Sequence, residues 1–179
     1  MTPEELYKLR FPIGEFEMPS HVSTELKERW IQSIHSFPFT LRALVQGLSS
    51  EEKNLTYRPE GWNIKQVVHH CADSHMNSLI RFKLTLTEDA PTIRPYYEDR
   101  WAMLNDGQDD DLSDSLDLLT ALHSKWVKLL NGLTDEDLRL TYVHPEHGQS
   151  FTLLEAIGTY AWHCDHHLGH VRLAIDSTK

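Results

Sequence analysis

Histidine is the residue type in this sequence with the most potential for chemistry. The chain has 12 histidines among 179 residues. Seven of them fall into two groups: His69, His70 and His75, and then His163, His166, His167 and His170. Neutral imidazole is a common ligand of zinc, nickel and copper in proteins. The clustering therefore indicates a site for one transition-metal ion.

The second group contains two pairs of histidines four residues apart, His163/His167 and His166/His170. Side chains at this spacing share one face of an α-helix, which is why H-x-x-x-H recurs in metal sites. With about 100° per residue, the apolar stripe of this helix centres on Cys164, and His167 and His163 flank it at about −60° and −100°. His170 and His166 lie farther round, at about −120° and −160°. Only the His163/His167 pair is therefore expected to face the interior.

The first group leaves a choice between two histidines. The apolar stripe of its helix centres on Val68 and includes His75, whereas His70 lies nearly opposite. Periodicity alone favours His75 as the buried histidine. A helix can also line a polar pocket with the face opposite its packing stripe, so the spacing leaves His70 and His75 both open as a third ligand.

Four segments with apolar residues three and four apart are predicted to be long helices: residues 23–48, 63–86, 112–130 and 152–175. Pro38 is expected to kink the first. A short β-ribbon is expected between Tyr142 and Phe151. The pattern predicts an all-α four-helix bundle with long connecting loops, forming one domain over residues 1–179. Metal sites in bundles are built from facing helices, so the two histidine groups can meet.

An internal echo supports two related helix pairs. Residues 47–57 align without gaps on residues 132–142, with six of eleven positions identical. Each copy has a capping box, Ser49-x-x-Glu52 or the acidic variant Thr134-x-x-Asp137. The echo predicts helix hairpins related by a pseudo-two-fold axis, with chance similarity of two connections as the alternative. Between the halves, residues 88–111 form a connection long enough to be either functional or loosely ordered. Its acidic run, residues 109–111, is interpreted as the solvated start of the third helix.

Charge and composition exclude several classes of function. The formal net charge is −10, which argues against a nucleic-acid partner and against docking on an anionic membrane. No apolar run reaches the length of a membrane span, and the N-terminus lacks the pattern of a secretory signal, so a cytoplasmic protein is expected. Cys71 and Cys164 do not form a C-x-x-C pair, so a structural zinc knuckle is excluded and both are expected to be buried.

Several longer motifs resemble the DinB-like superfamily, most closely its YfiT-type branch of metal-dependent hydrolases, which also includes bacillithiol transferase-like proteins. The motifs are residues 57–78, Phe11-Pro12-Ile13-Gly14, residues 92–96 and residues 160–170. The resemblance implies a four-helix bundle, a homodimer, and one zinc or nickel ion per subunit. In this family the first ligand is the histidine eight residues after a motif tryptophan.

Trp62 is that tryptophan here, so the resemblance selects His70 over His75 as the first ligand. The other two family ligands are the ends of the H-x-x-x-H on the last helix, His163 and His167. Three imidazoles leave a zinc ion with an open coordination position, as in catalytic sites.

Three functions fit this ligand set. The first is a hydrolase that activates water for attack on a small-molecule substrate. The second is a thiol S-transferase that activates bacillithiol or another low-molecular-weight thiol on the same metal. The third is a non-catalytic metal-binding or sensing bundle, in which His166, Glu155 or Asp73 would fill the open position.

The remaining candidates have weaker support from the sequence. Asp73 and Asp165 are candidates to accept a hydrogen bond from a ligand imidazole, with surface solvation as the alternative. Arg81, Arg94 and Tyr96 are candidates to bind an acidic group of the substrate, with ordinary bundle contacts as the alternative. Surface or core packing is assigned to the other histidines, namely His21, His35, His123, His144 and His147.

Overall fold

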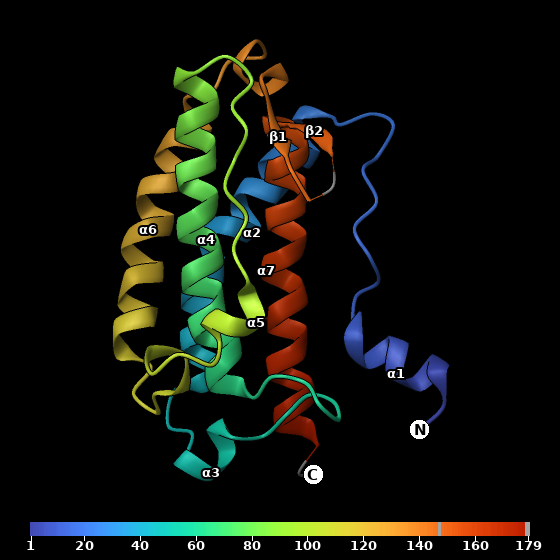
Figure 1. Cartoon of the computed structure of the whole chain (residues 1–179), viewed down its shortest axis with the longest axis vertical. Helices are drawn as coiled ribbons and strands as arrows, with labels where there is room; N and C mark the ends of the chain where they lie inside the picture. The colour runs from blue at the N-terminus through green and yellow to red at the C-terminus, as the bar shows by residue number, and fades with distance from the viewer. Residues whose placement is uncertain (147, 178–179) are drawn as a thin grey trace.

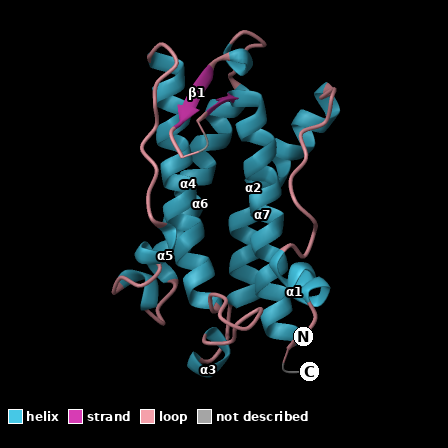
Figure 2. Ribbon diagram, turned by 45° about the vertical axis from the view of Figure 1, so that its right-hand side comes forward, coloured by secondary structure: helices cyan, strands magenta, loops and turns pink. Residues whose placement is uncertain are grey.

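Four long helices form a bundle in the computed structural model, which describes residues 1–146 and 148–177 (Figures 1 and 2). The long helices are α2 (Thr24–Val45), α4 (Ile64–Thr87), α6 (Ser113–Asn131) and α7 (Leu153–Asp176). The connections contain α1 (Pro3–Arg10), α3 (Ser50–Lys53), α5 (Glu98–Trp101) and two 3₁₀ turns, η1 (Asp106–Gln108) and η2 (Asp137–Arg139). The predicted four-helix bundle is therefore confirmed.

Polar side chains define where the long helices begin. The Ser23 hydroxyl accepts a hydrogen bond from the Leu26 amide at 3.2 Å and caps α2. Capping boxes start α4, through Asn63 and Gln66, and α7, through Thr152 and Glu155. The start of α6 differs, because the backbone amide of its first residue donates to the Asp111 carboxylate at 3.0 Å.

The consecutive long helices α2 and α4 do not form a main packing pair. Helix α2 packs against α6 and α7, and α4 packs against the same two helices, so α2 and α4 lie diagonally across the bundle. Residues 88–111 run back along the bundle from the end of α4 to the start of α6 (Figure 1). This crossover makes α4 and α6 parallel and brings α4 beside α7, where the two histidine groups face each other.

The crossover is ordered by backbone and side-chain hydrogen bonds. The Ile93 amide donates to the Val143 carbonyl at 3.0 Å, and the Val143 amide donates to the Pro91 carbonyl at 2.9 Å. The Gln66 side chain on α4 donates to the Ala102 carbonyl at 3.1 Å. The alternative that this long connection is loosely ordered is therefore wrong.

The acidic run in the crossover makes specific contacts. Asp110 forms an ion pair with Lys65 at 2.8 Å and also accepts a hydrogen bond from Ser50. The run is therefore not a purely solvated helix start, because Asp110 ties the beginning of α6 to α4.

A core of aliphatic and aromatic side chains fills the bundle. Its largest fully buried side chains include Trp126, Phe37, Phe82 and Leu119. Cys71 and Cys164 are buried free thiols, as predicted. Helix α2 continues through Pro38, which is itself buried. Within the described residues, no helix has the length and apolar character needed to cross a membrane.

The echoed segments lie at opposite ends of the bundle and both form their predicted capping boxes (Figure 1). Ser49 and Glu52 exchange two hydrogen bonds at 2.7 and 3.2 Å. Thr134 and Asp137 do the same at 2.8 and 3.2 Å. The predicted ribbon is also present, as β1 (Thr141–His144) paired antiparallel with β2 (Gln149–Thr152). His147, between these strands, lies outside the described residues.

Candidate metal centre

Three histidines predicted to be metal ligands lie together between α4 and α7. The ligand nitrogens of His70, His163 and His167 are all within 4.8 Å of one another. Nε2 of His70 lies 3.4 Å from Nε2 of His163. Nitrogens at about 2.0–2.1 Å from a tetrahedral zinc ion are about 3.4 Å apart, so this pair has the separation that one ion requires.

His70 lies opposite the apolar stripe of α4 but is buried, with 6% of its surface exposed. That face of α4 meets the histidines of α7 rather than solvent. The Trp62 ring also covers His70, with the two ring centroids 4.5 Å apart. The face opposite the packing stripe therefore lines a polar pocket, which is the possibility that the helix periodicity left open.

His75 is fully buried, as its place in the apolar stripe predicted. Its Nε2 lies 3.0 Å from Nδ1 of His163, the nitrogen on the side of that ring away from His70. His75 therefore lies behind the three-histidine cluster and contacts it through His163.

A row of hydrogen bonds, here called the core relay, runs from His163 through His75 and His123 to the Ile34 carbonyl. His75 Nδ1 lies 2.7 Å from His123 Nε2, and His123 Nδ1 lies 2.5 Å from the carbonyl oxygen. A carbonyl only accepts, so His123 Nδ1 carries the proton. A neutral imidazole carries one proton, so Nε2 of His123 is an acceptor and His75 Nδ1–H donates to it. For the same reason, Nε2 of His75 accepts a hydrogen bond from His163 Nδ1–H. His163 Nε2 is left with a lone pair.

A second row, the outer relay, runs from His167 through His170 to the Arg10 carbonyl. His170 Nε2 lies 3.1 Å from that oxygen, and the Nδ1 atoms of His170 and His167 are 3.3 Å apart. By the same reasoning His170 donates to the carbonyl and accepts from His167 Nδ1–H. His167 Nε2 therefore also keeps a lone pair. Tyr57 stacks on His170, with ring centroids 3.8 Å apart and planes 14° apart.

Burial keeps these histidines in the neutral form that binds metal. Desolvation, together with the charges of His166 and His170, lowers the pKa of His70 to about 3. Desolvation lowers the pKa of His123 and of His170 to about 4. Burial likewise holds the pKa values of His75, His163 and His167 well below the ordinary value. The site therefore presents uncharged nitrogen donors at neutral pH.

The two expected carboxylate partners of the ligands have other contacts. Asp165 accepts a hydrogen bond from the Ser33 hydroxyl at 3.4 Å. The pKa of Asp73 is raised to about 6, mainly by burial and then by the charge of Asp106. Other histidines, rather than carboxylates, therefore hydrogen-bond the rings of His163 and His167.

His166 differs from its predicted position. The helix wheel directed it away from the interior, but it is 8% exposed and stacks on Trp162, with ring centroids 4.3 Å apart. The Phe11 ring also lies beside it, at 6.0 Å between centroids. The wheel was wrong here because a distant segment, residues 11–16, covers this face of α7.

Small residues and one tryptophan hold residues 11–16 against α7. The Trp162 indole N–H donates to the Gly14 carbonyl at 2.9 Å. Gly169 lies under Pro12 so closely that a Cβ on this glycine would come within 2.8 Å of the proline ring. This packing positions the Arg10 carbonyl for the outer relay.

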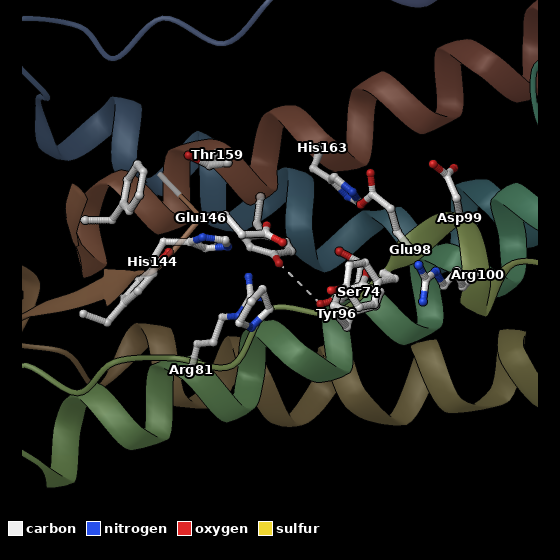
Figure 3. Close-up of a pocket in the computed structure, with 15 residues that line it drawn as sticks. Ser74, Arg81, Tyr96, Glu98, Asp99, Arg100, His144, Glu146, Thr159 and His163 are labelled. Atoms are coloured by element: carbon white, nitrogen blue, oxygen red, sulfur yellow. Dashed lines mark hydrogen bonds between the residues drawn. The ribbon is translucent and has the colours of Figure 1, made fainter. Parts of the chain in front are cut away.

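Two cavities meet beside His163. The smaller, of about 420 Å³, is lined by the three clustered histidines together with His166 and His170. The larger, of about 680 Å³, extends from His163 toward the β-hairpin (Figure 3). Glu98 and Asp99, on α5, line both cavities.

Glu98 is a candidate site residue that sequence reasoning missed. Its carboxylate is drawn beside the His163 imidazole (Figure 3), and its pKa is raised by burial and by the charge of Asp99. It lies on a four-residue helix inside the crossover, where no periodicity singled it out.

Only two of the three candidates for binding an acidic substrate group line the larger cavity. Arg81 and Tyr96 line the larger cavity, whereas Arg94 is exposed and does not line it. His144, which was assigned to surface or core packing, lines the same cavity. His21 and His35 are exposed, as expected.

Comparisons with known proteins identify the family. The family model of the DinB superfamily matches residues 25–171. The chain belongs to the DinB superfamily. A Bacillus subtilis (strain 168) relative named "Putative metal-dependent hydrolase YfiT" is 45% identical over 163 residues, covering 91% of this chain and 92% of the relative. A Bacillus cereus (strain G9842) relative, also named a "Putative metal-dependent hydrolase", is 47% identical over 163 residues, covering 91% and 93%.

A solved structure supports the assignment to this superfamily. It has a TM-score of 0.92 and 43% sequence identity with this chain, and covers 96% of this chain and 98% of its own. It is described as YfiT from Bacillus subtilis, "a probable metal-dependent hydrolase with an unusual four-helix bundle topology". The family resemblance predicted from the motifs is confirmed.

Proposed function

We propose that this DinB superfamily member is a metal-dependent hydrolase that holds one zinc or nickel ion between His70, His163 and His167. The main support is the tautomeric state that the two relays impose. They leave Nε2 of His163 and of His167 as lone-pair donors beside His70, inside a cluster only 4.8 Å across. The names of the two Bacillus relatives support the same class of activity.

The donor set favours catalysis over metal sensing. When bound, an ion of this kind polarises a substrate carbonyl and lowers the pKa of a coordinated water or thiol. Three protein donors leave a coordination position for that chemistry. Within the described part of the chain, the cluster has three members, and Glu155 is instead bonded to Thr152 at the start of α7. The larger cavity gives a small molecule access to His163.

Glu98 is the residue best placed to move protons. It lines both cavities beside His163, so its carboxylate reaches the space where a nucleophile and a leaving group meet. A carboxylate there takes the proton of the attacking group and returns it to the departing one.

The first test is metal content per chain, measured by elemental mass spectrometry on the purified wild type and variants. We expect about one zinc or nickel ion per chain in the wild type and none in His70→Ala, His163→Ala or His167→Ala. His35→Ala, which removes an exposed histidine of α2, is the matched control and should keep the ion. A wild type that takes up no metal, even after reconstitution, contradicts the proposal.

The second test separates hydrolysis from thiol transfer. Metal-loaded protein is incubated with a panel of carboxylic esters and amides, with and without a low-molecular-weight thiol. Release of carboxylic acid in the absence of thiol supports the hydrolase. Glu98→Gln should abolish this release while its metal content stays unchanged. A thioether formed only when thiol is present, with no thiol-independent hydrolysis, replaces this proposal with a thiol S-transferase. The choice of zinc or nickel, the homodimer and the cytoplasmic location remain predictions.

A further inference from the structure

The larger cavity has a cationic side chain, Arg81, away from the three clustered histidines. Arg81 follows His70 by eleven residues on α4, a rise of about 16 Å that returns to within about 20° of the same helix face. The two side chains therefore share the cavity-lining face of α4. Figure 3 shows Arg81 on the side of the cavity near His144 and His163 on the side near Glu98.

Among the described residues, the guanidinium of Arg81 has no hydrogen-bond or ion-pair partner. Its Nε atom is buried and has no hydrogen-bond partner, and no carboxylate of the described residues forms an ion pair with this side chain. Guanidinium groups carry five N–H donors arranged to match a carboxylate. Because buried donors in native proteins are normally satisfied, the unpaired Nε of Arg81 in a cavity wall points to a ligand that supplies the acceptor.

Aromatic side chains line the cavity along with Arg81. Tyr96, Tyr142, Phe151 and Tyr160 are the principal ones. Burial raises the pKa of Tyr142 to about 12, and the charge of nearby Arg81 opposes that rise. These rings suit an apolar or aromatic spacer.

Acidic side chains limit the charge that the cavity accepts. Glu98 and Asp99 lie at the histidine end, and Glu146 also lines the wall. Their repulsion disfavours a multiply charged group such as a phosphate. Of the two arginines that line the cavity, Arg100 lies on α5 next to Glu98 and Asp99, so Arg81 is the cation at the other end.

We infer that the substrate is an elongated carboxylic acid. Its carboxylate accepts hydrogen bonds from Arg81, its spacer packs among the tyrosines, and its hydrolysable carbonyl lies beside the histidine cluster. A cavity of about 680 Å³ has the size of a typical small-molecule site. The inference rests on the proposed function for the reacting end only, because the Arg81 subsite does not need the metal ion.

The probes are monohydroxamates of straight-chain dicarboxylic acids from succinic to sebacic acid, compared with their terminal amides. The hydroxamate chelates the metal, and the other end tests Arg81. Isothermal titration calorimetry on zinc-loaded protein should show, at one chain length, about tenfold or greater preference for the acid. Arg81→Gln should abolish that preference at unchanged metal content, and Arg81→Lys should keep part of it. Arg94→Gln, which makes the same charge change on an exposed residue, should retain all of it.

A metal-free arm keeps this inference separate from the hydrolase proposal. Hexanoate should bind metal-free protein more tightly than hexanamide, and Arg81→Gln should remove the difference. If no metal binds but hexanoate is preferred through Arg81, the hydrolase proposal fails and the subsite stands. Equal binding of acid and amide in every wild-type series, or an unchanged preference in correctly folded Arg81→Gln, overturns the inference.

Discussion

The two relays perform the same task in different surroundings. The core relay takes one group from each long helix: His163 from α7, His75 from α4, His123 from α6 and the Ile34 carbonyl from α2. The outer relay involves α7 and the last residue of α1. One ligand is therefore oriented by the packing of the whole bundle, and the other by a segment docked on its surface.

The packing around the relays differs accordingly. His75 and His123 are fully or almost fully buried against Phe37 and Trp126, with ring centroids 5.1 to 6.0 Å apart. His170 is held mainly by the stacked Tyr57 ring and the Arg10 carbonyl. The difference teaches that changes in the core relay affect stability and metal affinity together, whereas changes in the outer relay act mostly on the metal.

The largest expected effect comes from removing the ligand at the head of either relay. Mutating a residue that hydrogen-bonds a metal ligand typically lowers metal affinity about 10–100-fold. His163→Ala and His167→Ala remove the ligands themselves, so each should lower zinc affinity by far more. Competition with a chromogenic chelator measures this. If only one variant loses affinity, the two relays do not serve equivalent ligands and the comparison fails.

The next effect is loss of the middle of the core relay. His75→Ala should lower the free energy of unfolding by about 2–4 kcal/mol, because it removes a buried ring and leaves two hydrogen-bonding groups unpaired. It should also lower zinc affinity about 10–100-fold. Urea unfolding and chelator competition measure the two effects.

His69→Ala is the matched control for His75→Ala. His69 is also buried on α4, but it bonds Ser115 at 2.8 Å and the Asp109 carbonyl at 3.0 Å. This variant should lose stability and keep its zinc affinity. Equal losses of zinc affinity in both variants would mean that the core relay acts only through general packing.

The core relay also predicts a pH dependence of stability in metal-free protein. The pKa of His123 is about 4 in the folded chain and about 6.5 when unfolded, so between these values only the unfolded state is protonated. The free energy of unfolding therefore falls as pH decreases, by about 1.4 kcal/mol per pH unit for this residue. Urea unfolding across this range measures the slope. In His123→Phe the slope should be smaller by about 1.4 kcal/mol per pH unit, the contribution of one proton. An unchanged slope would show that His123 is not held in the neutral form in the folded chain.

The smallest expected effect comes from disturbing the N-terminal segment that positions the Arg10 carbonyl in the outer relay. Gly169→Ala places a Cβ about 2.8 Å from the Pro12 ring, so the N-terminal segment must shift. We expect a loss of about 1 kcal/mol in stability, a several-fold loss of zinc affinity, and faster amide exchange in residues 10–16. Gly132→Ala is the control, since its Cβ meets nothing closer than 3.5 Å. Slow, unchanged exchange in Gly169→Ala would show that the segment tolerates the clash.

Local patterns predicted the helices and their ends. Apolar spacing placed the four long helices to within three residues of their observed bounds, and the capping boxes of both echoes formed as expected. The apolar stripe of α4 identified His75 as buried. The selection of His70 came from the family motif that begins at Trp62, because periodicity describes which face of a helix is apolar and not what lies opposite its polar face.

Tertiary structure alone decided how the histidines are connected. His123 was assigned to packing, yet it bonds partners 48 and 89 residues away along the chain. His166 was directed outward, but residues 11–16 cover it. Glu98 came from a connection without periodicity. The sequence by itself determined the helices, their buried faces and, through the family motif, the three candidate ligands. Hydrogen bonds between distant segments depend on how the helices cross, and no local pattern in the sequence records that.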